Sequence, residues 1–93
     1  MATQILAVGT NALSSSDVTV TSGSSLTVAL KGDNGARVNS GAVVKIELKA
    51  DDGNYYEVGE LSGYTGKTGT MIDAPGTYRF SRIAGGACGV FSA

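Results

Sequence analysis

The fold is decided between residues 42 and 61, which read AVVKIELKADDGNYYEVGEL. Hydrophobic and charged residues alternate over residues 44–49, which is the pattern of a strand with one buried face. Residues 51–54 are typical of a tight turn, because Asp, Asn and Gly favour turn conformations. Alternation then resumes with Tyr56 and Val58. The stretch therefore predicts a β-hairpin in which these two side chains face the core.

The same period of two recurs on both sides of this hairpin. Further strands are predicted over residues 5–8, 18–21, 26–31, 71–72, 77–81 and 88–91. The strands on either side of the turn at 22–24 are expected to pair as a second hairpin. Helical spacing is absent. Seven to eight short strands at this spacing predict an all-β fold, a small antiparallel β-sandwich or barrel.

The predicted core consists of the hydrophobic residues that this alternation turns inward. They are Val18, Val20, Leu26, Val28, Leu30, Val44, Ile46, Leu48, Tyr56, Val58, Leu61, Ile72, Tyr78, Phe80, Val90 and Phe91. Burying each large aliphatic side chain contributes about 1.5–3 kcal/mol, which the entropy of ordering the chain largely offsets. We therefore expect a thin stability margin and self-association with further copies of the chain.

The chain of 93 residues is expected to form a single domain, residues 1–93. Residues 1–13 have two interpretations. Ile5, Leu6, Val8 and Leu13 precede a run of three serines, so this segment is either an N-terminal arm that orders on a neighbour or the first strand of the chain's own sheet. An arm could be deleted without loss of the β-sheet signal.

Charge and hydropathy exclude two classes of partner. Seven basic and eight acidic residues give a net charge of −1, and the basic residues are scattered. Nucleic-acid binding requires clustered lysine and arginine, so we predict none. No run approaches the 18 apolar residues of a membrane span, so we predict no membrane partner. A single cysteine and an initial Met fit synthesis in a reducing cytoplasm.

Candidate catalytic and metal-binding residues all have a simpler structural interpretation. Without histidine, no Ser-His or Cys-His arrangement can form. Asp51 and Asp52 belong to the predicted turn, and Cys88 has no basic neighbour to activate it. The acidic stretches at 33–35 and 51–54 lack the ligand spacing of a calcium loop. We predict no enzyme activity, no cofactor and no metal site.

Several polar side chains are expected on the surface. Tyr55 and Tyr64 are predicted to be exposed, where tyrosines form either a sugar-stacking surface or protein-contact anchors. The two interpretations remain open at this point. Lys45, Glu47 and Lys49 are expected to form a cross-strand ladder with Glu57.

The C-terminal third resembles a known group of proteins. Residues 73–82 read DAPGTYRFSR, and a glycine-rich break then leads to Gly89-Val90-Phe91. This ending, with the strand pair before it, resembles small structural proteins of tailed bacteriophages over residues 42–93. The Pro-Gly-Thr-Tyr turn also occurs in immunoglobulin-like and fibronectin-like modules.

The resemblance implies a non-enzymatic virion protein that decorates or cements the capsid and binds the major capsid protein or another virion protein. Such proteins assemble as trimers or dimers, so the resemblance also implies a homo-oligomer of one of these two kinds. The protein would be made in the host cytoplasm and located in the virion. Candidate protein-contact residues are Ile5, Leu6, Val8, Leu13, Tyr55 and Tyr64. The alternatives are a tail, baseplate or head-fibre module, or an adhesive or carbohydrate-binding β-sandwich.

Overall fold

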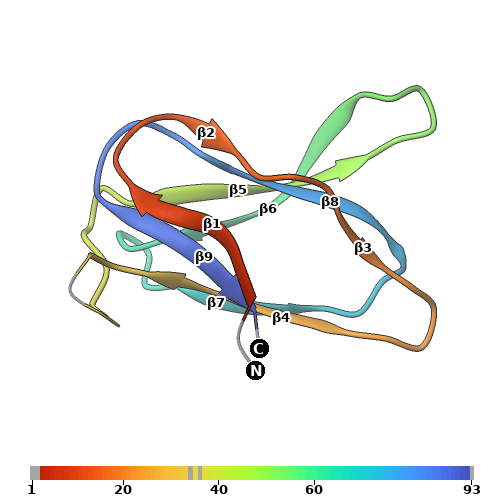
Figure 1. Ribbon diagram of the computed structural model, residues 1–93, viewed down its shortest axis with the longest axis horizontal. Coiled ribbons are helices and arrows are strands. Elements are labelled where there is room, and N and C mark those ends of the chain that lie inside the picture. Colours follow the sequence, from red (N-terminus) through yellow and green to blue (C-terminus); the bar gives the residue numbers. More distant parts are fainter. Residues whose placement is uncertain (1–2, 34, 36, 93) are drawn as a thin grey trace.

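Two antiparallel sheets form the molecule in a computed structural model, which describes residues 3–33, 35 and 37–92 (Figure 1). The four-stranded sheet has the order β1-β9-β4-β7, formed by Thr3–Gly9, Cys88–Ser92, Leu26–Lys31 and Gly69–Ile72. The five-stranded sheet has the order β2-β8-β5-β6, formed by Leu13–Ser14, Gly76–Arg82, Val43–Lys49 and Tyr55–Ser62, and β3 (Val18–Val20) also pairs with β8.

The prediction of an all-β fold is confirmed, and its architecture is a sandwich. The described residues contain nine strands and no helix, one strand more than the upper end of the predicted range. The additional strand, β2, has two residues and is too short to show a hydrophobic period. No helix in the described part of the chain is long and apolar enough to span a membrane.

The core lies between the two sheets. Phe80, Val44 and Leu61 from the five-stranded sheet meet Val28 and Val90 from the four-stranded sheet, and each of these side chains is at most 1% exposed. Most of the predicted inward residues are buried or packed against this cluster. Phe91 is an exception: it is half-buried on the opposite face from Val90, because adjacent residues of a strand point to opposite sides.

The predicted hairpin over residues 42–61 is confirmed as β5 and β6. Its turn runs from Ala50 to Asn54, with Gly53 at a φ of 85°. However, Tyr56 and Val58 are 53% and 55% exposed rather than buried.

Two features of the hairpin explain this exposure. The β5–β6 register shifts between Ile46 and Glu47, which leaves Val58 as an extra residue in the edge strand. Tyr56 pairs with Leu48 near the hairpin tip, and Figure 1 shows this tip projecting beyond the other sheet. Tyr56 therefore points to the same side as the core residues but is exposed, because the opposite sheet does not reach the hairpin tip.

The second predicted hairpin, over residues 18–31, is wrong. A turn does form, since the Ser24 N–H donates to the Thr21 carbonyl, but it joins two different sheets. β3 pairs with β8, whereas β4 pairs with β7 and β9. Alternation indicates which face of a strand is buried, but the strand's partner depends on contacts distant in sequence.

Residues 3–9 form a strand of the chain's own sheet. β1 pairs with β9 and contributes Leu6 to the core, where it is 4% exposed. Deleting residues 2–13 would therefore remove a core strand rather than a detachable arm.

Candidate functional site

The outer faces of the two sheets differ in charge. The strands β1, β4, β7 and β9 carry a single charged residue, Lys31, whereas β5, β6 and β8 carry seven, of which only Arg82 is buried. The ion pairs between described residues all involve side chains of the five-stranded sheet. One face of the sandwich is therefore charged and the other is almost neutral.

On the charged face, Tyr55 is held by several neighbours. Its hydroxyl donates to Asp17 Oδ1 at 2.6 Å, and the Arg79 guanidinium stacks 3.7 Å from the ring centroid. Lys49 Nζ lies 3.5 Å from Asp17 Oδ2. The Tyr55 hydrogen bond, helped by Lys49, lowers the pKa of Asp17, and the same hydrogen bond raises the pKa of Tyr55. The polar groups of Asp17, Tyr55 and Lys49 thus bind one another within the chain.

The remaining charges on this face, apart from Glu60, are also paired. Lys45 bonds Glu57 at 2.9 Å, as the predicted ladder requires. Glu47 instead pairs with Arg79 at 2.9 Å and accepts a hydrogen bond from Ser81 at 2.5 Å. Burial opposes ionisation of Glu47, but these two hydrogen bonds outweigh it and lower its pKa. The ladder thus extends to β8 and Asp17, beyond the hairpin on which it was predicted.

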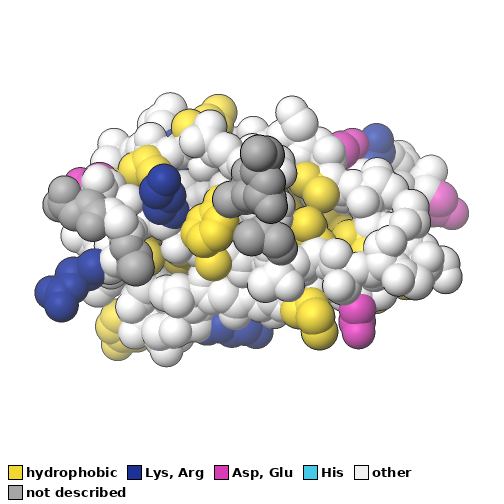
Figure 2. Space-filling view, turned by 60° about the horizontal axis from the view of Figure 1, so that its bottom comes forward, with side chains coloured by type: hydrophobic (Ala, Val, Ile, Leu, Met, Phe, Trp, Pro, Cys, Tyr) yellow, Lys and Arg dark blue, Asp and Glu magenta, His cyan; other side chains and the backbone are white. Residues whose placement is uncertain are grey.

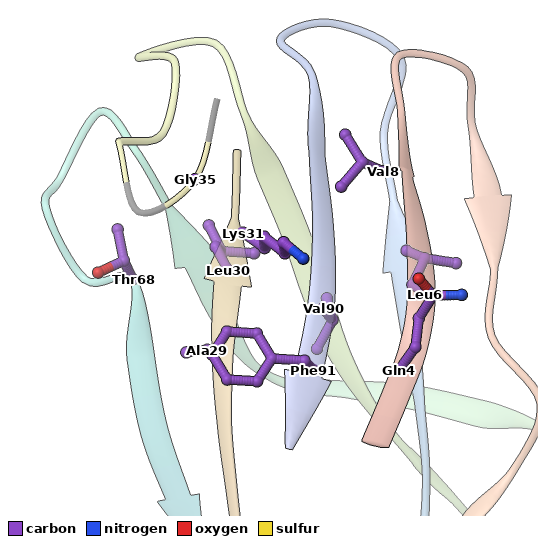
Figure 3. A pocket seen from close by; sticks show the side chains of 10 residues that line it. All are labelled: Gln4, Leu6, Val8, Ala29, Leu30, Lys31, Gly35, Thr68, Val90 and Phe91. Atoms are coloured by element: carbon purple, nitrogen blue, oxygen red, sulfur yellow. The ribbon is translucent and has the colours of Figure 1, made fainter. Parts of the chain in front are cut away.

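The neutral face contains a groove of about 600 Å³ (Figure 3). It crosses β1, β9 and β4 and reaches the loop after β4, and the residues that line it are Gln4, Leu6, Val8, Ala29, Leu30, Lys31, Gly35, Thr68, Val90 and Phe91. Figure 2 turns the bottom of Figure 1 forward, and hydrophobic side chains are visible at the surface in the middle of this view.

The groove combines an apolar floor with a few polar groups. Phe91 pairs with both Ala29 and Gln4, so it lies on the outer face of β9, between β4 and β1. Lys31 and Thr68 lie toward the loop end in Figure 3, and Gln4 lies on the β1 side. Among described residues, no acid pairs with Lys31. Volumes of this order and apolar linings are typical of binding sites.

The predicted contact residues are only partly brought together. Leu6 and Val8 both line the groove, but Val8 is 39% exposed whereas Leu6 is 4% exposed and belongs to the core, against which Ile5 packs. Leu13 is 47% exposed on β2, in the other sheet. Phe91 was predicted to be a core residue together with Val90. Its outward position could have been predicted, because adjacent residues of a strand point to opposite faces and Val90 points inward.

Tyr55 and Tyr64 do not form one platform. Tyr55 begins β6 and Tyr64 follows its end, so an eight-residue strand of about 26 Å separates them. Tyr64 is 83% exposed, whereas Arg79 covers the ring of Tyr55. A sugar-stacking surface built from both rings is therefore not present.

The other candidate residues have structural roles. Asp52 accepts hydrogen bonds from the Asn54 N–H and the Tyr56 hydroxyl, and the Asn54 bond in particular lowers its pKa. Cys88 is fully buried, and burial raises the pKa of its thiol. Within the described residues, no three acidic or thiol groups gather. Asn34, part of one calcium candidate, lies outside them.

Fold and groove together define a small antiparallel β-sandwich with one charged and one nearly neutral face. Comparisons with protein-family models, curated proteins and solved structures found no match to this chain.

Proposed function

We propose that the chain is a non-enzymatic structural protein of a tailed-phage virion, a capsid decoration or cement protein. The virion assignment rests on the sequence resemblance over residues 42–93. The surface that would dock on the capsid protein is the neutral face of the four-stranded sheet.

The observation that carries this proposal is the contrast between the two faces. Charged side chains lose hydration when a contact forms, so protein interfaces are depleted of them at their centres. The described strands of the groove face have one charge, while the opposite face holds most of its charges in partly hydrated ion pairs. A protein oriented in this way presents its neutral face to a shell and its charged face to water.

Composition of purified particles tests the assignment. Quantitative mass spectrometry of the phage that encodes the chain should find it at hundreds of copies per particle. A few copies up to a few dozen would favour the tail, baseplate or head-fibre alternative. Absence from particles would overturn the proposal and favour a separate binding module.

A pair of matched variants tests the docking face. Val8→Glu places a charge in the groove, whereas Leu13→Glu places one on a comparably exposed residue of the other sheet. We expect Val8→Glu to weaken binding to undecorated capsids at least about tenfold, since burying an unpaired charge is costly, and Leu13→Glu to leave it unchanged. Equal binding by both variants would exclude this face.

A further inference from the structure

Within the described residues the two sheets have four strand edges, and three of them are protected against pairing. β1 has two register irregularities, and β6 has a bulge and carries Glu57 and Glu60. β2 and β3 have only two and three residues. Bulges, charges and shortness are the usual ways in which edge strands avoid pairing with another chain.

The fourth edge, β7, has neither a charge nor a bulge. Its residues Gly69-Thr70-Met71-Ile72 pair with β4 in unbroken register. Met71 is 60% exposed, and with Val58 it lines a second groove of about 250 Å³ between β6 and β7. Two charged side chains, Lys67 and Asp73, also line this groove, and no ion pair between described residues includes either of them.

We propose that β7 pairs with β7 of a second copy, antiparallel across a two-fold axis at Thr70, joining two four-stranded sheets into one. This contact is separate from the groove proposed to dock on the capsid, and it does not depend on the virion assignment.

Hydrogen-bond direction restricts the register of this pairing. The Leu30 N–H donates to the Thr68 carbonyl at 2.7 Å, so Thr68 faces β4. Backbone groups alternate in direction along a strand, so Thr70 and Ile72 also face β4, whereas Gly69 and Met71 face the open edge. The residues that exchange hydrogen bonds with the second copy are therefore Gly69 and Met71 on both strands. The Lys67 carbonyl accepts from the Ser62 N–H at 2.8 Å within the chain, so Lys67 contributes only its side chain to the contact.

Charge then selects one register among those allowed. Centring on Thr70 places Gly69 opposite Met71 of the second copy and Lys67 opposite its Asp73. The two-fold axis repeats this ion pair, and the glycine leaves room for the methionine side chain. Moving the two-fold axis to Gly69 would place Lys67 opposite Met71 of the second copy. Moving it to Met71 would place Asp73 opposite Gly69. Opposite charges across a strand pair are stabilising, so the centred register is favoured.

A charge-exchange experiment tests this pairing with the whole chain. Lys67→Glu would face Asp73, and Asp73→Lys would face Lys67, so each single variant should weaken self-association at least about tenfold in sedimentation equilibrium. An equimolar mixture of the two variants should restore it, because the heterodimer regains both opposite-charge pairs. Unchanged circular dichroism and thermal unfolding would show that each variant folds.

Matched controls change net charge by the same amounts elsewhere. Arg37→Glu and Asp51→Lys lie outside the proposed contact and should associate like the unaltered chain, alone or mixed. Amide hydrogen exchange provides an independent measure: protection of Gly69 and Met71 should rise with protein concentration, while Thr70 and Ile72 should be protected throughout.

Three results would overturn the proposal. The unaltered chain could remain monomeric up to about 1 mM, the single variants could associate as it does, or the mixture could associate no better than its components. Each is independent of whether the chain binds capsids.

Discussion

Arg82 is a buried cation that binds backbone carbonyl groups. It is 3% exposed, and its guanidinium donates to the carbonyls of Ala7, Asn11 and Cys88 and to the Asn11 side chain, at 2.6–2.9 Å. No ion pair between described residues includes it. The planar group with five donors thus joins the end of β8 to β1, to the segment after β1 and to β9.

Replacing Arg82 by lysine should destabilise the fold by about 2–4 kcal/mol. One ammonium cannot reach acceptors on three segments, and buried carbonyls would lose their partners. Arg79→Lys on the charged face is the control, with an expected loss of about 1 kcal/mol or less because its ion pair is partly hydrated. Denaturant unfolding measures both, and equal losses would show that Arg82 has no special structural role.

At the scale of elements, β1 lies so close to β9 that only glycine fits between them. A Cβ on Gly89 would lie 2.5 Å from the Leu6 carbonyl oxygen and 2.8 Å from the Val8 nitrogen. The register of β1 shifts on both sides of Leu6, which bends the strand over this position. The path of the β1 backbone therefore depends on residue 89 of β9 being glycine.

Gly89→Ala should cost about 1–3 kcal/mol, because the methyl group would push the β1 backbone away from β9. Gly59→Ala in β6 is the matched control: its Cβ would meet only Ile46 at an ordinary 3.5 Å, so its stability should change by about 0.5 kcal/mol or less. Thermal unfolding compares the two. A Gly89→Ala protein as stable as the control would mean that β1 can shift freely.

For the whole molecule, the charged face makes stability depend on pH. The pKa values of Asp17, Glu47 and Asp52 all lie below their ordinary values of 3.8, 4.5 and 3.8. Because the folded state lowers these pKa values, their stabilising contribution is present above the ordinary values and is lost as the pH falls through the lowered ones. Hydrogen-bonded carboxylates on the charged face and in the β5–β6 turn thus predict sensitivity to acid.

We expect the melting temperature to fall as the pH is lowered from about 5 to about 2. Asp17→Asn should show a shallower fall than the unaltered chain, since one of the three groups no longer takes up a proton. Asp51→Asn is the control and should follow the unaltered chain. Differential scanning calorimetry across this range checks the effect, and a constant melting temperature would contradict it.

Local sequence determined the fold class, the central hairpin and most of the core. Alternation over residues 44–49 requires only that one face of a strand is buried, and the turn at Gly53 follows from local backbone preferences. The same reasoning failed for residues 18–31, because a turn of identical appearance can join strands of one sheet or of two. It failed again at Tyr56, whose inward direction was predicted correctly but whose exposure depends on where the opposite sheet ends.

Only the tertiary structure decided which surface is available for binding. The groove assembles Val8, Ala29 and Phe91 from strands far apart in the sequence, and no local pattern indicates that they are neighbours. The unprotected edge of β7 likewise emerges only from strand order and register. Period and turn chemistry act between residues near in sequence, whereas strand partners are selected by the packing of the whole chain, so the sequence by itself determined the elements and the tertiary structure decided the site.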